Sequence, residues 1–363
     1  MVTTKRRRTK IGIILGTRPE IIKLSPIVQV CQEQKANFFI LHTNQHYSEN
    51  MDRIFFKDLE LPEPKYNLNI QERLHGKMIG RMIVGIEEVL IKEKPDWILV
   101  QGDTNTVLSG ALAASKLNVK IGHVEAGLRS YDRTMPEEIN RIVVDHIADA
   151  LFCPTKKQAN IAGNEGIPAS KIFVTGNTIV DAVFRGKKIL EKGRLADKYK
   201  GERFALLTLH RPSNVDDCET LFRILEAVRS AAVKNNLKIY FPMHPRTRKN
   251  LETFKINLDP NTFKLIEPVG FLEMLTLEQS AKVILTDSGG VQEEACILGI
   301  PCVTIRENTE RPETAEVGAN VLVGSDPKKI QKGITDSLSQ KRHWKNPFGD
   351  GLAGKRIFKH ITK

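Results

Sequence analysis

Acidic side chains stand shortly after apolar runs in the first half of this sequence, where they could transfer protons. Asp103 follows the run 97–100, and Glu125 comes directly after the run 120–124. Glu137 lies further along, in a Met-Pro-Glu segment. Carboxyl groups act as general acids or bases when their surroundings hold them in different protonation states. These three carboxyl groups are therefore candidates for proton transfer, with the assignment of acid and base left open.

Structural roles are the alternative for the same carboxyl groups. Asp103 stands where it could cap the following helix, and Thr134 with Glu137 matches a capping box. A buried carboxylate is costly unless it is paired. A functional site explains three acids at one expected edge better than three separate caps do, because basic side chains converge there as well. The basic residues are Arg18, Lys23, Arg129 and Arg141.

The turn after the first apolar run could bind an anion. It reads GTRPE (16–20), with Lys23 close behind. Pro19 suits the first turn of a helix, and the free N–H groups beside Arg18 would attract a phosphate. A plain turn with a surface arginine is the alternative. The GxGxxG fingerprint is missing, so we expect neither a nicotinamide nor any other cofactor.

In the second half, the sharpest local signal is the segment 287–290, which reads Asp-Ser-Gly-Gly after an apolar run. Two glycines, Gly289 and Gly290, let backbone amides approach a phosphate, and the Ser288 hydroxyl adds a donor. Glu294, just over one turn later, could reach ribose hydroxyls. A flexible turn before an ordinary helix is the alternative.

Three more polar residues follow apolar runs in the second half. They are His210, His244 and Arg311. A histidine after a strand is more often a structural hydrogen-bonding residue than a ligand. Arg311 would be delivered to the same edge as the glycine segment.

The elements that must position these residues alternate regularly. Apolar runs predict strands at 11–15, 38–42, 97–100, 120–124, 151–153 and 172–174, and again at 204–209, 238–242, 264–266, 283–285, 302–305 and 321–323. Helical patterns separate them, for example at 19–32, 78–93, 104–116, 218–234, 290–298 and 328–339. This rhythm predicts an α/β protein with two Rossmann-like, doubly wound parallel-sheet domains.

We expect the first domain at 1–176 and the second at 177–345, with 341–363 forming one or two helices. Ligands of open parallel sheets bind beyond the carboxyl ends of the strands. If the two sheets face one another, the ligand would lie in a central cleft, with acids on one side and a phosphate cradle on the other.

Composition excludes several classes of protein. The chain has 363 residues and a formal net charge of +12, which would suit nucleic acid, but aromatic residues are only 6% and do not interleave with basic ones. No nucleic-acid partner is expected. No apolar run is long enough to cross a membrane. The five cysteines show no metal-ligand spacing, so no metal is expected.

The basic start of the chain, 1–10, is not followed by a signal-peptide pattern, and we expect a cytoplasmic protein.

Taken together, these segments resemble the non-hydrolysing UDP-N-acetylglucosamine 2-epimerases. The matching segments occur in family order over nearly the whole chain, and the ordered set is specific. They are GTRPEIIKLSP (16–26), TNQHY (43–47), QGDTNT (101–106), HVEAGLRS (123–130), MPEEINR (135–141), TGNTIVD (175–181), LTLHRPSN (207–214), DSGGVQEEA (287–295) and ERPE (310–313).

The resemblance implies a glycosyltransferase-B type fold, a homodimer, and a C-terminal helix, 346–363, that returns to the first domain. It implies catalytic roles for Asp103, Glu125 and Glu137. It places Arg18, Lys23 and Arg141 at sugar and phosphate positions. UDP would be bound by Ser288, Gly289, Gly290, Glu294, His210, His244 and Arg311, with Phe271 near the uracil. The implied reaction converts UDP-N-acetylglucosamine into UDP-N-acetylmannosamine.

The sequence departs from the family pattern in two places. Bacterial members that hold a second substrate molecule as an activator often carry Gln-His-x-Gln, whereas here Gln45 and His46 are followed by Tyr47 and Ser48. Arg73 is followed by Leu74 instead of glutamine. The departures count against an activator site. The loop 130–134 is similar to a branch that includes epimerases of diacetamido-uronic acid nucleotides, so the sugar substituents stay open.

Three alternatives remain on the residues alone. A hydrolysing 2-epimerase would release free N-acetylmannosamine and UDP. A glycosyltransferase of the same fold would usually need one base and an acceptor groove, and a nucleotide-binding module would need no acid/base residues.

Overall fold

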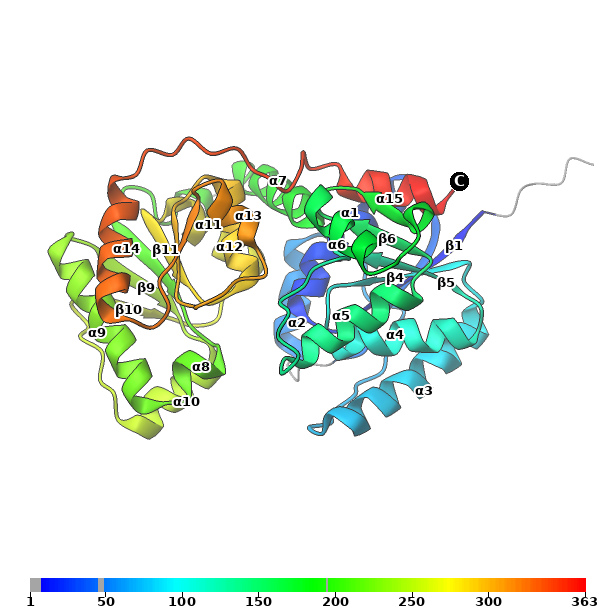
Figure 1. Cartoon of the computed structure of the whole chain (residues 1–363), viewed down its shortest axis with the longest axis horizontal. Coiled ribbons are helices and arrows are strands. Elements are labelled where there is room, and N and C mark those ends of the chain that lie inside the picture. The colour runs from blue at the N-terminus through cyan, green and yellow to red at the C-terminus, as the bar shows by residue number, and fades with distance from the viewer. Residues whose placement is uncertain (1–7, 45–48, 194) are drawn as a thin grey trace, which may run out of the picture. The chain divides into compact units, whose positions relative to one another are not determined.

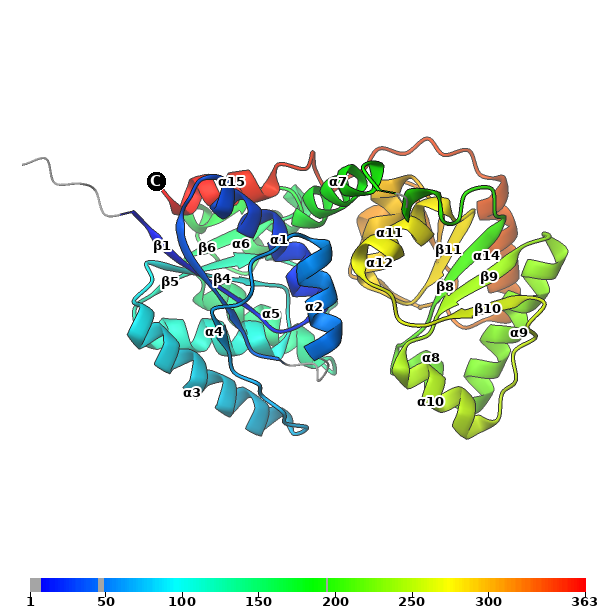
Figure 2. The same ribbon diagram turned by 180° about the vertical axis from the view of Figure 1, so that it is seen from behind.

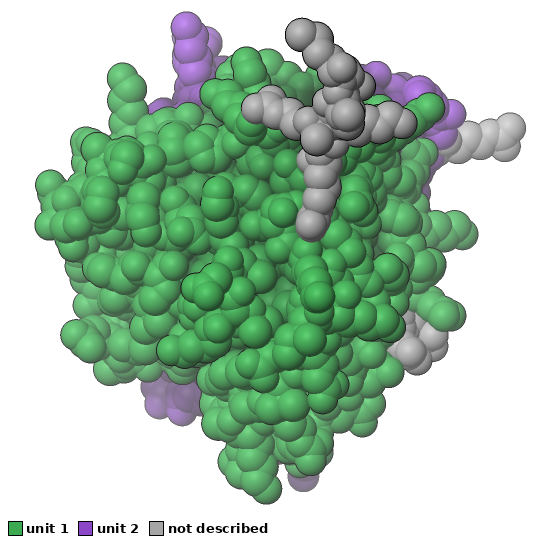
Figure 3. All heavy atoms as spheres, turned by 90° about the vertical axis from the view of Figure 1, so that its right-hand side faces the viewer, with its two compact units in different colours: residues 1–184, 348–363 green, residues 185–347 purple. Residues whose placement is uncertain are grey.

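The computed structural model describes residues 8–44, 49–193 and 195–363. It divides into two compact units, the first made of residues 1–184 and 348–363 and the second of residues 185–347. Figure 3 colours the two units green and purple. The basic residues Lys5, Arg6 and Arg7, and the segment 45–48 that bears on the activator site, lie outside the described residues.

Unit 1 contains a parallel sheet of seven strands in the order β3-β2-β1-β4-β5-β6-β7. Strands β1, β4 and β5 form its centre, and their near-continuous apolar runs are buried on both faces, as parallel sheets require. The strands are β1 (Lys10–Leu15), β2 (Asn37–His42), β3 (Tyr66–Asn67), β4 (Trp97–Gln101), β5 (Lys120–Val124), β6 (Ala150–Cys153) and β7 (Ile172–Val174).

Helices cover both faces of this sheet. Figures 1 and 2 show α1 and α15 on one face and α3, α4 and α5 on the other. Helix α6 packs on the same face as α3, α4 and α5, since Ala162 lies in the same buried cluster as Met82, Ala111 and Val144. The helices are α1 (Arg18–Glu33), α2 (Glu49–Asp58), α3 (His75–Glu93), α4 (Asn105–Lys116), α5 (Pro136–Ile147), α6 (Lys156–Asn164), α7 (Thr178–Glu191), in which the division between the units falls, and α15 (Ala353–Ile361).

The C-terminal helix α15 packs against α1 within unit 1. Gly354 permits this close approach, because a Cβ atom there would lie 3.1 Å from Pro26. Asp181 of α7 accepts hydrogen bonds from the backbone N–H groups of Ala353 (3.2 Å) and Gly354 (2.9 Å). These bonds satisfy donors at the start of α15 that the helix itself cannot satisfy.

Unit 2 contains a parallel sheet of six strands in the order β10-β9-β8-β11-β12-β13. The strands are β8 (Phe204–Thr208), β9 (Lys238–Pro242), β10 (Phe263–Ile266), β11 (Val283–Thr286), β12 (Cys302–Thr304) and β13 (Asn320–Leu322). The helices are α8 (Pro212–Val215), α9 (Cys218–Lys234), α10 (Pro245–Phe254), α11 (Phe271–Ser280), α12 (Gly289–Leu298), α13 (Pro312–Glu316) and α14 (Pro327–Ser339).

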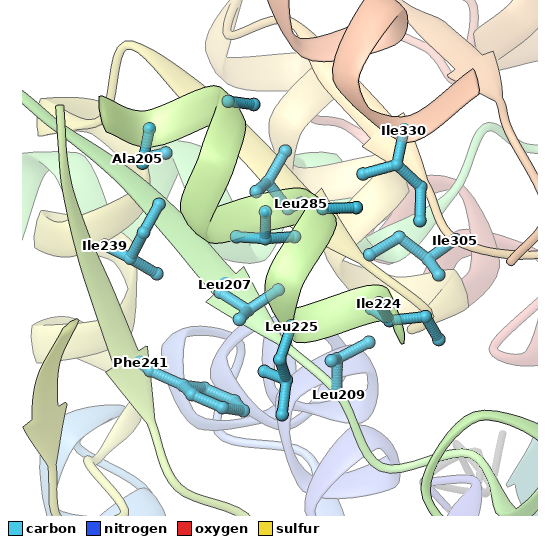
Figure 4. Packing of buried hydrophobic residues seen from close by; sticks show 14 of the residues in the cluster. Ala205, Leu207, Leu209, Ile224, Leu225, Ile239, Phe241, Leu285, Ile305 and Ile330 are labelled. Atoms are coloured by element: carbon cyan, nitrogen blue, oxygen red, sulfur yellow. The ribbon is translucent and has the colours of Figure 1, made fainter. Parts of the chain in front are cut away.

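One core of unit 2 lies between its sheet and the helices α9 and α14. Figure 4 shows Leu207 of β8 and Leu285 of β11 among the side chains of this cluster. Ile224 of α9 and Ile330 of α14 are also fully buried in it. Each such side chain stabilises the fold by about 1.5–3 kcal/mol relative to an exposed position. The core fixes the strands whose carboxyl ends carry the polar residues.

The predicted architecture of two parallel sheets covered by helices is confirmed. The sequence analysis did not name β3, which has only two residues, or the helices α2 and α6. The segment 341–363 forms one helix, α15, after an irregular stretch. Along the described residues, no helix combines the length and the apolar character that crossing a bilayer requires.

Candidate active site

Neighbouring strands bring two of the candidate carboxylates to the same edge of unit 1. Strands β4 and β5 pair in parallel, with Gln101 opposite Val124. Asp103 and Glu125 follow these two positions. Because the carboxyl ends of parallel strands share one edge, both side chains emerge there.

Asp103 is not the helix cap that its position suggested. Thr104 is the N-cap of α4, and its hydroxyl accepts from the N–H of Val107. The carboxylate of Asp103 instead pairs with the guanidinium of Arg141 from α5. Its side chain keeps an exposed fraction of 30%, whereas Arg141 is buried. The Asp103 side chain is therefore held in place by Arg141 and is still partly exposed to a ligand.

Glu125 has an unusual backbone conformation. Its φ angle is +66°, a left-handed value that residues other than glycine rarely adopt. Its carboxylate lies 2.5 Å from the Lys23 ammonium and accepts a hydrogen bond of 3.0 Å from the Gln101 amide. Non-glycine residues held in this region are concentrated at functional sites, where the surrounding structure enforces the conformation. This backbone conformation ends the strand before Glu125, whose carboxylate pairs with Lys23.

Glu137 lies at the start of α5, and the predicted capping box is wrong. The N-cap is Met135 and Pro136 is the first helical residue, so Glu137 stands one position too early for the box. Proline favours this position because its missing N–H costs nothing there. The Thr134 hydroxyl donates to Asp132 at 2.6 Å instead. Glu137 is exposed, and its carboxylate makes no ion pair within the described part of the chain.

Glu138, which the sequence did not single out, holds the loop before α5. It is buried and accepts hydrogen bonds from the N–H groups of Ser130 and Tyr131, both 2.9 Å, and from the Ser130 hydroxyl. Arg141 lies 2.8 Å away. Burial opposes its charge, but these bonds and Arg141 outweigh burial and lower the pKa of Glu138. Arg141 thus bridges this loop and Asp103.

Arg129 does not join this group, contrary to the expectation that it converges with the carboxylates. Its guanidinium lies 2.7 Å from Asp145 and 2.5 Å from Glu165. His123 also contacts Asp145, at 2.7 Å, and its other ring nitrogen lies 2.8 Å from the carbonyl oxygen of Gly102. Arg129 and His123 are therefore both partners of the buried Asp145, as a buried carboxylate requires.

Glu20 links two loops of the edge and was also missed. One carboxylate oxygen accepts from the N–H groups of Gly16 (2.6 Å) and Thr17 (2.7 Å), and the other accepts from the Thr104 hydroxyl. Burial raises the pKa of Glu20 to about 7, although these hydrogen bonds lower it. The Thr-x-x-Glu pattern could have indicated the cap on α1 but not the link to Thr104. The link ties the turn that carries Arg18 to the loop that carries Asp103.

Arg18 and Gly16 lie in that turn. The Arg18 guanidinium lies 5.7 Å from the ring centre of Phe55 in α2. Gly16 cannot be replaced by a larger residue, because a Cβ atom would lie 2.0 Å from the Thr43 hydroxyl and 2.4 Å from the Thr106 hydroxyl. The turn is therefore tightly packed beneath its basic side chain.

In unit 2, a buried aspartate orients His210. Asp287 follows β11 and accepts from the N–H groups of His210 (3.0 Å) and Arg211 (2.9 Å). Its carboxylate also faces Nδ1 of His210 at 2.8 Å. Burial opposes its charge, but the bonds from His210 and Arg211 outweigh burial and lower the pKa of Asp287. The contact makes Nδ1 the donor and leaves Nε2 available to a ligand.

His244 lies beside His210, with their ring centres 5.4 Å apart. Its Nδ1 accepts from the N–H of Arg246 and caps α10. The structural role expected as the alternative is therefore present. The residue is exposed.

The start of α12 has the features of an anion site. Ser288 is the N-cap, but its hydroxyl makes no cap bond, and Gly289 and Gly290 begin the helix. A Cβ atom at Gly289 would have no described atom nearer than 3.9 Å, so the space above the backbone is open. The first N–H groups of a helix have no intrahelical partner and carry partial positive charge. A phosphate could approach both the amides and the hydroxyl.

The remaining candidates of unit 2 lie in buried or half-buried surroundings. Glu294 is 8% exposed in α12, and Arg311 pairs with Glu293 at 2.5 Å. Phe271 begins α11, is 3% exposed, and packs its ring over Gly186. The ring is therefore part of the core of unit 2.

Comparison with known proteins identifies the family. Residues 29–362 match the sequence model of the family described as UDP-N-acetylglucosamine 2-epimerase. A UDP-N-acetylglucosamine 2-epimerase of Methanococcus maripaludis is 57% identical over 356 residues, covering 96% of this chain and 97% of that protein. A UDP-2,3-diacetamido-2,3-dideoxy-D-glucuronate 2-epimerase of Pseudomonas aeruginosa is 44% identical, covering 98% of this chain and 99% of that protein.

A solved structure is similar over nearly its full length. It is the crystal structure of Methanocaldococcus jannaschii UDP-GlcNAc 2-epimerase in complex with UDP-GlcNAc and UDP, with a TM-score of 0.91 and 55% identity, covering 98% of this chain and 99% of that one. The match of the family model and these alignments agree with the ordered motifs and with both sheets. The chain belongs to the UDP-N-acetylglucosamine 2-epimerase family.

Proposed function

We propose that this protein is a non-hydrolysing UDP-N-acetylglucosamine 2-epimerase that interconverts UDP-N-acetylglucosamine and UDP-N-acetylmannosamine. The relatives named above support the substrate class. The observation that carries the mechanism is the pair Asp103 and Glu125, which end neighbouring strands and are each held against a cation, Arg141 and Lys23.

The chemistry requires acid/base groups because the hydrogen on carbon 2 is not acidic. A base removes this proton, the electron pair forms the double bond between carbons 1 and 2, and the bond from carbon 1 to the UDP oxygen breaks. UDP then adds back to carbon 1 while carbon 2 receives a proton on its other face. The intermediate is a bound 2-acetamidoglucal, and no redox cofactor takes part.

In this proposal, Asp103, Glu125 and Glu137 share the proton transfers. The first two carry defined ion-pair partners, whereas Glu137 is exposed and could move toward a ligand. General acid/base assistance is worth about 10²–10⁴-fold per group. Lys23 and Arg141 would hold the charge of the two fixed carboxylates, and Arg18 would contact the diphosphate.

Unit 2 would bind UDP. The amides of Gly289 and Gly290 and the Ser288 hydroxyl would bind phosphate oxygens, with His210, His244 and Arg311 stabilising the leaving diphosphate. Glu294 would accept from the ribose hydroxyls, and the backbone near Phe271 would adjoin the uracil. That both units act on one substrate molecule stays a prediction, as do the homodimer and the cytoplasmic location.

Proton NMR of the full chain with UDP-N-acetylglucosamine in heavy water tests this proposal. We expect UDP-N-acetylmannosamine, deuterium at carbon 2 of both sugars and no accumulation of free N-acetylmannosamine. Free sugar formed together with UDP would instead identify a hydrolysing enzyme. Turnover that requires an added acceptor would identify a glycosyltransferase.

The relative from Pseudomonas aeruginosa supports a second candidate substrate. Its name assigns it a UDP-linked diacetamido glucuronate, and it is 44% identical to this chain. The loop 130–134, which Glu138 fixes, is similar in the same branch. Competition between the two nucleotide sugars in the deuterium assay measures the ratio of their kcat/KM values. We expect the N-acetylglucosamine nucleotide to react faster, because the 57% identical relative is named for it.

A further inference from the structure

A buried aspartate of unit 1 has no role in the mechanism above. Asp145 lies in α5 with an exposed fraction of 1%. Its carboxylate lies 2.7 Å from Nδ1 of His123 and 2.7 Å from the Arg129 guanidinium, and it accepts a hydrogen bond of 3.1 Å from the N–H of Gly127. Burial raises the pKa of Asp145, but the contacts with His123 and Arg129 outweigh burial and lower it. Asp145 is therefore an ionised group in the interior.

The bond to Gly127 fixes the turn that carries Glu125. Gly127 stands two residues after Glu125 and has a φ angle of +79°. A Cβ atom at Gly127 would lie 2.4 Å from the carbonyl oxygen of Gln158, so this position is closely packed. The N–H of Glu125 donates to the Phe152 carbonyl at 3.1 Å. The turn after β5 is thus held by Phe152 on one side of Glu125 and by Asp145 on the other.

His123 extends the contacts of Asp145 to the second acid. Its Nδ1 faces Asp145, and its Nε2 lies 2.8 Å from the carbonyl oxygen of Gly102. Gly102 directly precedes Asp103 and has a φ angle of +82°. One carboxylate therefore fixes the backbone beside both acids, directly at Gly127 and through the imidazole ring at Gly102.

The two partners of His123 define the protonation of its ring. A carboxylate and a carbonyl oxygen are both acceptors, so each ring nitrogen must carry a hydrogen, and only the imidazolium form has both. The surrounding charges agree with this form. Asp145 and Glu165 are the two acids of the cluster, and Arg129 alone would balance only one of them. A protonated His123 balances the other, as buried charges require.

We propose that His123 is a buried imidazolium and that His123 and Asp145 are positioning residues, which fix the backbone beside Asp103 and Glu125 for proton transfer. This inference rests on the proposed function, in which these two acids transfer the protons. His123 and Asp145 act through the loops and do not touch the substrate. Their effect on the rate is large, because a displacement of about 1 Å at a reacting group can cost about 10²-fold.

Nuclear magnetic resonance of the full chain labelled with ¹⁵N-histidine tests the protonation of the ring. The signals of His123 are identified by their absence from the spectrum of His123→Gln and by their shift in Asp145→Asn. We expect a proton on both ring nitrogens of His123 in the wild type. A wild-type His123 with only one ring proton would overturn the inference.

The kinetic test replaces Asp145 by an amide of the same shape. Asp145→Asn cannot accept hydrogen bonds on both sides of its side chain, so it releases either the His123 ring or the turn at Gly127. We expect kcat for deuterium uptake at carbon 2 to fall about 10–100-fold, by analogy with the partners that orient metal-bound histidines. Binding of UDP, which we propose for unit 2, should stay close to that of the wild type.

Two further comparisons separate positioning from stability. Glu165→Gln is the matched control, because it removes the other carboxylate that pairs with Arg129 and leaves the contacts of Asp145 with His123 and Gly127 in place. Its kcat should equal that of the wild type. His123→Gln keeps an N–H that can donate to the loop, whereas His123→Met has a similar volume and no donor. His123→Gln should therefore retain more activity than His123→Met.

A wild-type kcat in Asp145→Asn, or an equal loss of kcat in Asp145→Asn and Glu165→Gln, would contradict the positioning role. If Asp145→Asn does not fold, the ring spectrum of the wild type and the comparison of the two His123 variants decide the question. A wild type that shows both ring protons but fails to epimerise would remove the proposed function and leave the imidazolium and its hold on the loop standing. Normal epimerisation with a single ring proton would remove the inference alone.

Discussion

Charged and polar groups are arranged differently at the carboxyl ends of the strands in the two units. In unit 1, acids and bases face each other as ion pairs, Glu125 with Lys23 and Asp103 with Arg141. In unit 2, the start of α12 offers backbone amides and a hydroxyl, and the nearby Arg311 is already paired with Glu293. Paired side chains can exchange protons with a ligand, whereas fixed amides can only bind one. In the proposed function, this contrast corresponds to proton transfer by unit 1 and phosphate binding by unit 2.

The strongest test of this contrast removes two acids of unit 1. Asp103→Asn combined with Glu137→Gln should lower the rate of deuterium uptake at carbon 2 by at least about 10³-fold, since each acid/base group is worth about 10²–10⁴-fold. Binding of UDP should stay within about threefold of the wild type. Asp96→Asn is the matched control, because Asp96 precedes β4 and lies at the opposite end of the same strand. Normal uptake by the double variant would remove these residues from the mechanism.

A second test removes the aspartate that orients His210. Asp287→Asn keeps the shape but weakens the contact with Nδ1, so the ring loses its preferred tautomer. We expect kcat to fall about 10–100-fold, by analogy with the partners that orient metal-bound histidines. Asp217→Asn, which keeps a capping residue at α9, should not change kcat. Equal kcat values for Asp287→Asn and Asp217→Asn would show that the function of His210 does not depend on Asp287.

The link between Glu20 and Thr104 predicts a smaller, coupled effect. Glu20→Ala and Thr104→Ala should each lower kcat by about tenfold, because either change releases the turn of Arg18 from the loop of Asp103. The loss in the double variant should be smaller than the product of the two single losses, since the contact between Glu20 and Thr104 can be broken only once. Thr104→Ser keeps the hydroxyl and should restore the rate. Fully additive losses would show that the two residues act independently.

The smallest expected effect is on stability against pH. The pKa of Glu20 is about 7 in the folded chain, against an ordinary value of 4.5. Its folded-state proton therefore adds stability below pH 4.5, and this contribution is lost as the pH rises to about 7. Glu20→Gln does not titrate, so the melting temperature of the wild type should fall relative to this variant over that range. A constant difference in melting temperature would contradict the assignment.

Local sequence patterns predicted which residues emerge at the strand edge better than they predicted which side chains those residues contact. The apolar runs of β4 and β5 indicated where Asp103 and Glu125 would emerge, because burial on both faces requires such runs. The partner of Arg129 could not be read from the chain, since Asp145 and Glu165 are distant in sequence. The start of α5 was misplaced because Thr134 and Pro136 both signal a helix start. The helix begins at Pro136, with Met135 as its N-cap.

The sequence by itself determined the alternation of strands and helices, the glycines at the start of α12 and the family, because each depends on residues close together in the chain or on their order. Only the tertiary structure decided which charges meet. The pairs Glu125–Lys23 and Glu20–Thr104 join separate elements, and burial raises the pKa of Glu20. The free energy of a carboxyl group depends on what surrounds it in space, and that is known only once the elements are packed.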